Sequence, residues 1–529
     1  MDELLNEYIE QEKQIELNEY SCDKNKVRKE QEQQEEQEYV DYIERTKEYY
    51  YNMTTGDLFR ALWFTLSSCY ICASEYVKHI IGLKSRNNAI IDVSKRLAEK
   101  NMMYVKVFQA FATNRNIVSQ ELNQFFNDYT DNVEYTNDEY DITELKELES
   151  CSLECYPYKQ LRILNEYKPI KSGLMSLIFK GVFITTENNQ NAASCSSANT
   201  DGRIGNEVVI KYLRKNISKN FTTSMNNLVV FAKLTRFFPY IRTLNVENLI
   251  LQNIVSLNDQ VNFRKELSNI KLYYRYWHDY TYVKIPKPYS DYTEQINPDI
   301  IVMEYIHGMK ITDIDPEDND TFGQILATFN AKAAFCTSFY HGDLHPGNIL
   351  FIKNPTTSDG SLERSSNEQF IPTYQIGILD FGIIGHLSRL DQELLFKSMK
   401  YMYLRQFNKI IDIIMSSELS ESMNPKQDVK SVLPEVNTAR YINLRNKLTD
   451  VLVRYTTPEI KFFGVSEIYE INYILNTYGL MFKRSLYRIF ITVAIMDSIG
   501  TRLGKKMSYM QHMTDIVVDM FNIDFQECK

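Results

Sequence analysis

The chain has 529 residues, of which 44% are hydrophobic and 24% are charged. This composition is typical of a folded globular protein and excludes a mostly disordered, collagen-like or disulfide-rich secreted chain. Lys and Arg number 59 against 69 Asp and Glu, so the formal net charge is −10. Because no overall positive field would attract a polyanion, we do not expect nucleic acid as a partner.

The first fifty residues are rich in Glu and Gln. A transit peptide is poor in acids and a signal peptide places an apolar stretch after a basic start, and residues 1–50 match neither pattern. We expect an acidic, helical or flexible arm over 1–50 of an intracellular protein, in a compartment that the sequence does not name. Eight cysteines are too few for a disulfide framework, which fits a reducing compartment.

Residues 61–74, ALWFTLSSCYICAS, form the longest uncharged apolar run. The run is too short to cross a bilayer, which takes about 20 residues in a helix. A core helix is the favoured prediction and an interfacial segment is the alternative. Cys69 and Cys72 could join Cys151 and Cys155 in a zinc site, but their place in an apolar helix favours ordinary packing.

Three structural regions follow along the chain. An apolar periodicity of three and four residues predicts a helix over 90–126, and a helical extension over 51–165. Alternating and β-branched segments predict strands at 177–185 and 207–213, within a small lobe at 166–305. Strands at 349–352 and 374–382 flank a polar insertion, and the chain is predicted to be helical after 388, within a large lobe at 306–529.

The strongest motif is His341-Gly-Asp-Leu-His-Pro-Gly-Asn348, followed after the insertion by Asp380-Phe-Gly382. In phosphoryl transfer one carboxylate serves the attacking hydroxyl, which here is Asp343. An amide five residues later, Asn348, and a second carboxylate, Asp380, can hold magnesium against the nucleotide phosphates. We therefore predict a site for ATP and magnesium.

Phosphoryl transfer also requires a cation for the phosphates. Glu207-Val-Val-Ile-Lys211 is a predicted strand that ends in lysine, as in the kinase Val-Ala-Ile-Lys pattern. The predicted helical partner of Lys211 is Glu266. The pattern over residues 298–308 predicts a strand that runs into a turn. There Glu304 and Ile306 would offer backbone groups to adenine, and Met303 would lie behind them.

These motifs resemble those of the UbiB or aarF-domain (ADCK-type) family of atypical kinases, from about Val93 to the final helices. Residues 106–109, Lys-Val-Phe-Gln, stand in the place of its Lys-x-Gly-Gln motif, and residues 169–176 in the place of its alanine-rich loop. The resemblance implies an α+β, bilobed, protein-kinase-like fold. It also implies that Lys106 and Gln109 contribute to the site from the helical extension.

The chain departs from the family pattern at several positions, as a divergent member would. Phe108 replaces the glycine of the Lys-x-Gly-Gln motif, and Gln260 replaces the first acid before Glu266. In the nucleotide-covering loop, Ser172 and Gly173 are predicted to let backbone amides approach phosphate.

The resemblance implies an atypical kinase or ATPase with an unknown acceptor, set in isoprenoid-quinone or lipid metabolism and in peripheral contact with membranes through residues 61–83. One alternative is a nucleotide-binding pseudokinase that acts as a scaffold. Another is a small-molecule phosphotransferase of the aminoglycoside or choline type, since these enzymes carry a similar catalytic loop.

Overall fold

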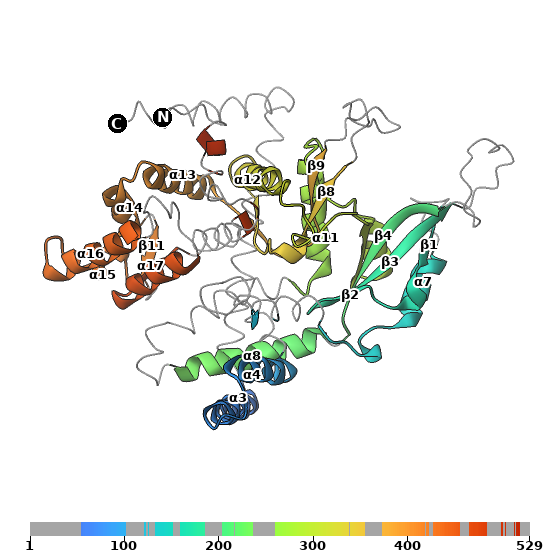
Figure 1. Ribbon diagram of the computed structural model, residues 1–529, viewed down its shortest axis with the longest axis horizontal. Coiled ribbons are helices and arrows are strands. Elements are labelled where there is room, and N and C mark those ends of the chain that lie inside the picture. The colour runs from blue at the N-terminus through green and yellow to red at the C-terminus, as the bar shows by residue number, and fades with distance from the viewer. Residues whose placement is uncertain are drawn as a thin grey trace.

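The computed structural model describes most of the chain outside the first fifty residues and the polar insertions. The described residues are 54–101, 121–122, 125, 133–151, 159–185, 204–215, 217–235, 260–337, 339–354, 373–417, 419–422, 427–454, 465–483, 499–500, 503, 513 and 515–518. Figure 1 shows a sheet-containing lobe and a helical lobe on either side of α11 (Phe263–Trp277), with two N-terminal helices below them.

The small lobe is built on an antiparallel sheet with the strand order β1-β3-β4-β6, in which β2 also pairs with β3. Its strands are β1 (Lys159–Ile163), β2 (Lys171–Ser172), β3 (Ser176–Thr185), β4 (Ile204–Leu213) and β6 (Ile300–Glu304). The predicted strands at 177–185 and 207–213 are confirmed. The polar insertion after residue 354 is likewise flanked by strands, as predicted, although the strand predicted over 374–382 ends at Ile378.

Side-chain alternation gives the small-lobe sheet two different faces. Phe179, Val208 and Tyr212 pack on the outer face, against α7 (Ile142–Ser150) and its buried Leu145. The intervening residues of β3 and β4 point to the other face, and Lys211 is one of them. A lysine on the inner face of a buried sheet is costly unless it is paired, so its partners matter.

The described part of the large lobe contains three small sheets and a set of helices. One sheet has the order β5-β9-β8, and β7 pairs with β10 in another. The strands are β5 (Val283–Lys284), β7 (Phe339–His341), β8 (Ile349–Lys353), β9 (Tyr374–Ile378) and β10 (Ile384–His386). The helices are α12 (Asn319–Phe335), α13 (Arg389–Tyr403), α14 (Phe407–Ile414), α15 (Val429–Val432), α16 (Ala439–Arg454) and α17 (Val465–Thr477).

The C-terminal region is mostly helical, as predicted, with one exception. β11 (Ser420–Ser422) and β12 (Leu480–Phe482) form an antiparallel pair between segments that are far apart in the chain. Strands of three residues have no detectable alternation, so only the contact between the two segments creates them.

The N-terminal extension contains α3 (Thr55–Ile80) and α4 (Arg86–Lys100), which pack on each other and, through α3, on α8 (Ile217–Thr235). The prediction of one continuous helix over 90–126 is wrong at Asn101, whose extended backbone ends α4, and residues 102–120 lie outside the described residues. Thr54 caps α3 in a capping box with Asp57, which defines where the helix begins.

Only one stripe of α3 packs on the protein. Its buried residues are Ala61, Phe64, Ser68, Ile71 and Glu75. The prediction of a core helix at 61–74 is therefore wrong for the other side of α3, where Cys69 and Cys72 are exposed free thiols. Within the described part of the chain there is no helix that meets the length and hydropathy needed to span a membrane.

Candidate active site

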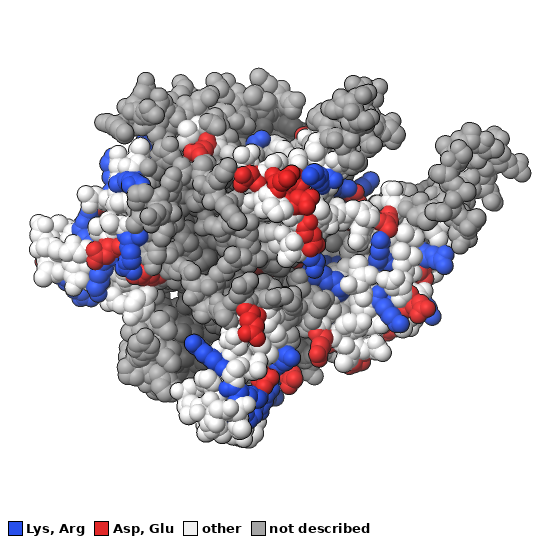
Figure 2. All heavy atoms as spheres, in the orientation of Figure 1, with Lys and Arg blue, Asp and Glu red and all other residues white. Residues whose placement is uncertain are grey.

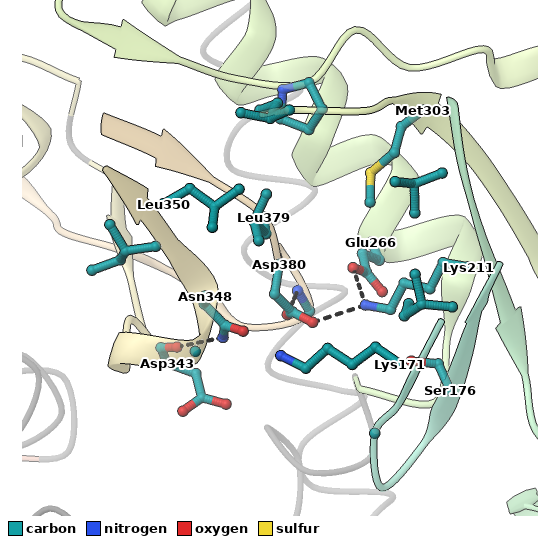
Figure 3. Close-up of a pocket in the computed structure, with 18 of the residues that line it drawn as sticks. Lys171, Ser176, Lys211, Glu266, Met303, Asp343, Asn348, Leu350, Leu379 and Asp380 are labelled. Carbon is teal, nitrogen blue, oxygen red and sulfur yellow. Dashed lines mark hydrogen bonds and ion pairs between the residues drawn. The ribbon is translucent and has the colours of Figure 1, made fainter. Parts of the chain in front are cut away.

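A cavity of about 320 Å³ lies where the inner face of the small-lobe sheet meets the loops of the large lobe. Its walls bring together residues from seven separate stretches of the chain. Figure 3 shows several of them around one space. The predicted site residues that line it are Gly173, Lys211, Glu266, Glu304, Ile306, Asp343, Asn348 and Asp380. A cavity of this size is in the range that holds small-molecule ligands.

Lys211 bridges two carboxylates at the back of this cavity. Its Nζ lies 2.5 Å from Glu266 Oε1 and 2.8 Å from Asp380 Oδ2. Glu266 is in the first turn of α11, on the stripe that also buries Phe263, Leu267 and Ile270. The sheet, α11 and the loop after β9 are therefore joined through one ammonium group.

The three charges alter one another's protonation. Burial alone would lower the pKa of Lys211, but Asp380 and Glu266 outweigh it and raise that pKa above its usual value. Burial would raise the pKa of Asp380, yet Lys211 holds it far below the ordinary value. Burial raises the pKa of Glu266, against the opposing effect of Lys211. Lys211 and Asp380 are thus charged over the whole physiological pH range.

The loop that carries Asp343 and Asn348 is held by hydrogen bonds within itself and to the Asp380 segment. His341 is completely buried, and its Nε2 contacts the Asp380 backbone oxygen while its Nδ1 accepts from the Asp343 N–H at 3.2 Å. Burial lowers the pKa of His341, which favours the neutral ring that this pair of contacts requires. The histidine therefore positions both aspartates.

The residues present fit a magnesium ion. The Asn348 side-chain nitrogen donates to the Asp343 backbone oxygen at 2.9 Å, which leaves the amide oxygen as the group available to a cation. Asp380 Oδ1 accepts from the Gly382 N–H at 2.9 Å and keeps a second lone pair. Carboxylate and amide oxygens are the ligands that this hard cation prefers.

The segment predicted to face adenine, residues 303–306, forms another wall of the cavity. Met303, Glu304 and Ile306 all line the cavity, next to Val209 of β4. Met303 and Ile306 are buried, and the side chain of Glu304 pairs with Lys284 at 2.9 Å, so that the cavity receives mainly apolar groups from this wall. A flat, apolar ring such as adenine suits this surface.

Residues 196–414 match the family described as the ABC1 atypical kinase-like domain. The matched residues include Lys211, Glu266, Asp343 and Asp380, and the matched domain is that of the UbiB and ADCK proteins. Residues 196–414, which are less than half of the chain, are therefore similar to an atypical kinase-like domain, and the fold is α+β, bilobed and protein-kinase-like, as predicted.

Two solved structures are similar to this chain. One is the complex of Rv3197 with erythromycin from Mycobacterium tuberculosis, at 14% identity and a TM-score of 0.41, covering 78% of this chain and 90% of that one. The other is the Rio2 kinase–ADP/Mg²⁺–phosphoaspartate complex from Chaetomium thermophilum, at 13% identity and a TM-score of 0.23, covering 64% and 74%.

The structure places Ser172 outside the cavity of the kinase-like domain. Its buried hydroxyl donates to the Val133 backbone oxygen at 2.5 Å and accepts from Arg214 at 2.6 Å. Arg214 holds the Ser172 side chain on the far side of the strand, and the approach of the Ser172 backbone amide to phosphate stays a prediction. Gly173 does line the cavity.

Lys171 and Gln260 line the cavity but were not predicted as site residues. Lys171, next to Ser172, extends into the cavity in Figure 3. Gln260 donates from Nε2 to Asp343 Oδ2 at 3.2 Å, and its buried Oε1 has no hydrogen-bond partner among the described residues. Both residues lie where the chain departs from the UbiB pattern, and these departures could have identified them as site residues from the sequence.

The remaining predicted residues of the helical extension, Lys106 and Gln109, lie outside the described residues, as does Phe108. Cys155 of the alternative zinc site lies outside them too. Among the residues that are described, no group of three or more His, Cys, Asp or Glu side chains is arranged to hold a metal ion.

Proposed function

We propose that this protein binds ATP with magnesium and transfers the terminal phosphoryl group to an acceptor hydroxyl or to water. The observation that carries the proposal is the contact of Lys211 with both Glu266 and Asp380, on the same cavity as Asp343 and Asn348. A cation, a metal-binding pair and a carboxylate for the nucleophile are the set that phosphoryl transfer uses.

Each residue has a separate task in this proposal. Lys211, held by Glu266, positions the phosphates. Asp343 accepts the proton of the attacking hydroxyl, or orients it, with Gln260 fixing one carboxylate oxygen. Asn348 and Asp380 would hold magnesium, which when bound neutralises charge on the phosphates.

The experiment is magnesium-dependent ATP hydrolysis by the wild type, Asp343→Asn and Asp380→Asn, with ATP binding measured in parallel. We expect both variants to lose turnover by about 10²- to 10⁴-fold. Asp343→Asn should keep ATP affinity within a few fold, since Asp343 acts on the nucleophile, whereas Asp380→Asn should weaken magnesium-dependent binding. No detectable ATP binding by the wild type would contradict the proposal.

The pseudokinase scaffold is the second candidate, and the altered loop at residues 169–176 favours it. It predicts ATP binding by the wild type with turnover no greater than that of Asp343→Asn and Asp380→Asn. The phosphotransferase of the aminoglycoside or choline type predicts transfer to small hydroxyl compounds, which a panel of such acceptors would detect.

By the resemblance to UbiB proteins, we place the acceptor in isoprenoid-quinone or lipid metabolism and propose peripheral membrane contact through α3. The outward stripe of this helix repeats every three or four residues. It contains Phe59, Trp63, Leu66, Tyr70 and Val77, with exposed fractions of 54% to 73%. Figure 2 shows a mostly uncharged surface at this end of the molecule with Lys and Arg beside it.

The positive charge near α3 favours an anionic lipid surface as the partner of its exposed stripe. Residues 54–101 contain seven Lys and Arg against four Asp and Glu, although the whole chain is acidic. Exposed aromatics flanked by basic residues are typical of helices that lie in a membrane interface. Co-sedimentation with vesicles that contain anionic phospholipid should be strong for the wild type and lost in Trp63→Ser/Tyr70→Ser. Unchanged vesicle binding by the Trp63→Ser/Tyr70→Ser variant would contradict membrane contact. So would a wild type that dimerises with rising concentration when this double variant does not.

A further inference from the structure

The charge of Lys211 is already matched before a nucleotide arrives. One ammonium faces the carboxyl groups of Glu266 and Asp380 at 2.5 and 2.8 Å, so its charge is already balanced within this cluster. Asp343 adds a further carboxylate to the cavity walls, whereas Glu304 is paired with Lys284. Beside Lys211 and the magnesium of the proposed function, a further cation would therefore strengthen the binding of a polyphosphate in this cavity.

Lys171 brings such a charge from the opposite wall. It lies in β2 at the edge of the small-lobe sheet, paired with Ile178, and both residues line the cavity. Figure 3 shows its side chain extending across the cavity toward the side that carries Asp343 and Asn348. In this fold the segment takes the place of the glycine-rich loop, which covers the phosphates with backbone amides.

Arg214 determines which residue of β2 enters the cavity. Its buried guanidinium donates to the Gly173 backbone oxygen at 3.0 Å and to Ser172 Oγ at 2.6 Å, and it pairs with Glu139 at 2.5 Å. Because neighbouring side chains in a strand point to opposite faces, fixing Ser172 on the far side directs Lys171 inward.

The turn after β2 is closed from within as well. The Gly173 N–H donates to the Ser176 backbone oxygen at 2.9 Å, and the Arg214 N–H donates to the Met175 backbone oxygen at 3.0 Å. These bonds hold the segment against β4. A braced loop of this kind presents a fixed side chain rather than a mobile set of amides.

We propose that Lys171 binds the terminal phosphates of the nucleotide and makes the site selective for triphosphate over unphosphorylated adenosine. This inference rests on the proposed function, since it assigns the part of that same cavity that recognises phosphate. Lys171 thereby offers the phosphates a positive charge in addition to that of Lys211, which is already paired with Glu266 and Asp380.

The experiment is calorimetric titration of wild type, Lys171→Met, Lys171→Gln and Lys171→Arg with Mg-ATP, adenosine and inorganic tripolyphosphate. A charge-assisted hydrogen bond lost from the site should weaken ATP affinity by about ten- to a hundredfold. Tripolyphosphate affinity should fall alongside it, adenosine affinity should change less than about twofold, and Lys171→Arg should recover part of the ATP affinity.

Lys168→Met is the matched control, because Lys168 lies three residues away and its side chain is 72% exposed. It should bind all three ligands like the wild type. Unchanged ATP affinity in Lys171→Met and Lys171→Gln, or equal weakening of ATP and adenosine, would overturn the role of Lys171 alone. A wild type that binds neither ATP nor adenosine would overturn the proposed function and this inference together.

Discussion

Lys211 and Asp380 are 169 positions apart in the chain, and the ammonium of one lies 2.8 Å from the carboxylate of the other. Because Lys211 keeps the pKa of Asp380 far below the ordinary value, this contact contributes its full stability only while Asp380 is ionised in the unfolded chain as well. The stabilisation is present above the unfolded pKa of about 3.9 and is lost as the pH falls toward the folded value.

We expect acid to reduce the free energy of unfolding of the wild type more than that of Asp380→Asn between pH 5 and pH 3. Urea unfolding at several pH values measures this difference. Asp279→Asn is the control, because its side chain is 95% exposed, and its curve should follow the wild type. Parallel curves for wild type and Asp380→Asn would show that the contact contributes no acid-sensitive stability.

Gln260 should influence the pKa of Asp343, the carboxylate proposed to serve the nucleophile. Its Nε2 donates to Asp343 Oδ2, so Gln260→Glu would replace a donor with a like charge. We expect the acid limb of the kcat–pH profile to move upward by about one pH unit in Gln260→Glu. Gln260→Leu removes the donor without adding charge, so it should lower kcat while moving the limb much less. Identical profiles for the two variants would contradict this role.

Gly385 makes close approach possible between the two strands that position His341. It pairs directly with Tyr340, and a Cβ atom at Gly385 would overlap the Tyr340 ring. We expect Gly385→Ala to lower the free energy of unfolding by about 1 to 3 kcal/mol. In a Tyr340→Leu background the same substitution should cost much less, which a double-mutant cycle measures. Equal costs in both backgrounds would show that the ring is not what limits this position.

Glu75 should hold the helical extension together. It is buried and pairs with Lys78 at 2.6 Å, Lys84 at 2.8 Å and Arg96 at 2.9 Å, and Lys78 and Lys84 lower its pKa to about 2. The stability it contributes is therefore present above about pH 4.3 and is lost as the pH falls toward 2.

Glu75→Gln should speed hydrogen exchange in α3 and α4 and lower the melting temperature. Asp57→Asn removes a surface pair with the exposed Arg60 and alters the capping box with Thr54, so its exchange should change only in the first turn of α3. Equal protection in Glu75→Gln and the wild type would mean that packing alone holds the two helices.

Spacing along the chain was enough to predict that Asp343 and Asn348 lie on the same site, and both line the cavity. Asp343 and Asn348 are five residues apart in one turn, and such local relations survive in any tertiary arrangement. The alternation of β4 likewise predicted a lysine at the end of a strand. The partner of that lysine was also identified correctly, because Glu266 is in the first turn of an amphipathic helix.

Other features depended on contacts between distant segments. An apolar run does not say which of its sides meets the core, so the exposed stripe of α3 emerged only once α4 and α8 were in place. Strand alternation required Lys171 and Ser172 to face opposite ways, but it did not say which of them entered the cavity. Arg214 lies 42 positions beyond Ser172 and hydrogen-bonds to its side chain. Because this bond holds Ser172 on the far side of the strand, the side chain of the neighbouring Lys171 faces the cavity.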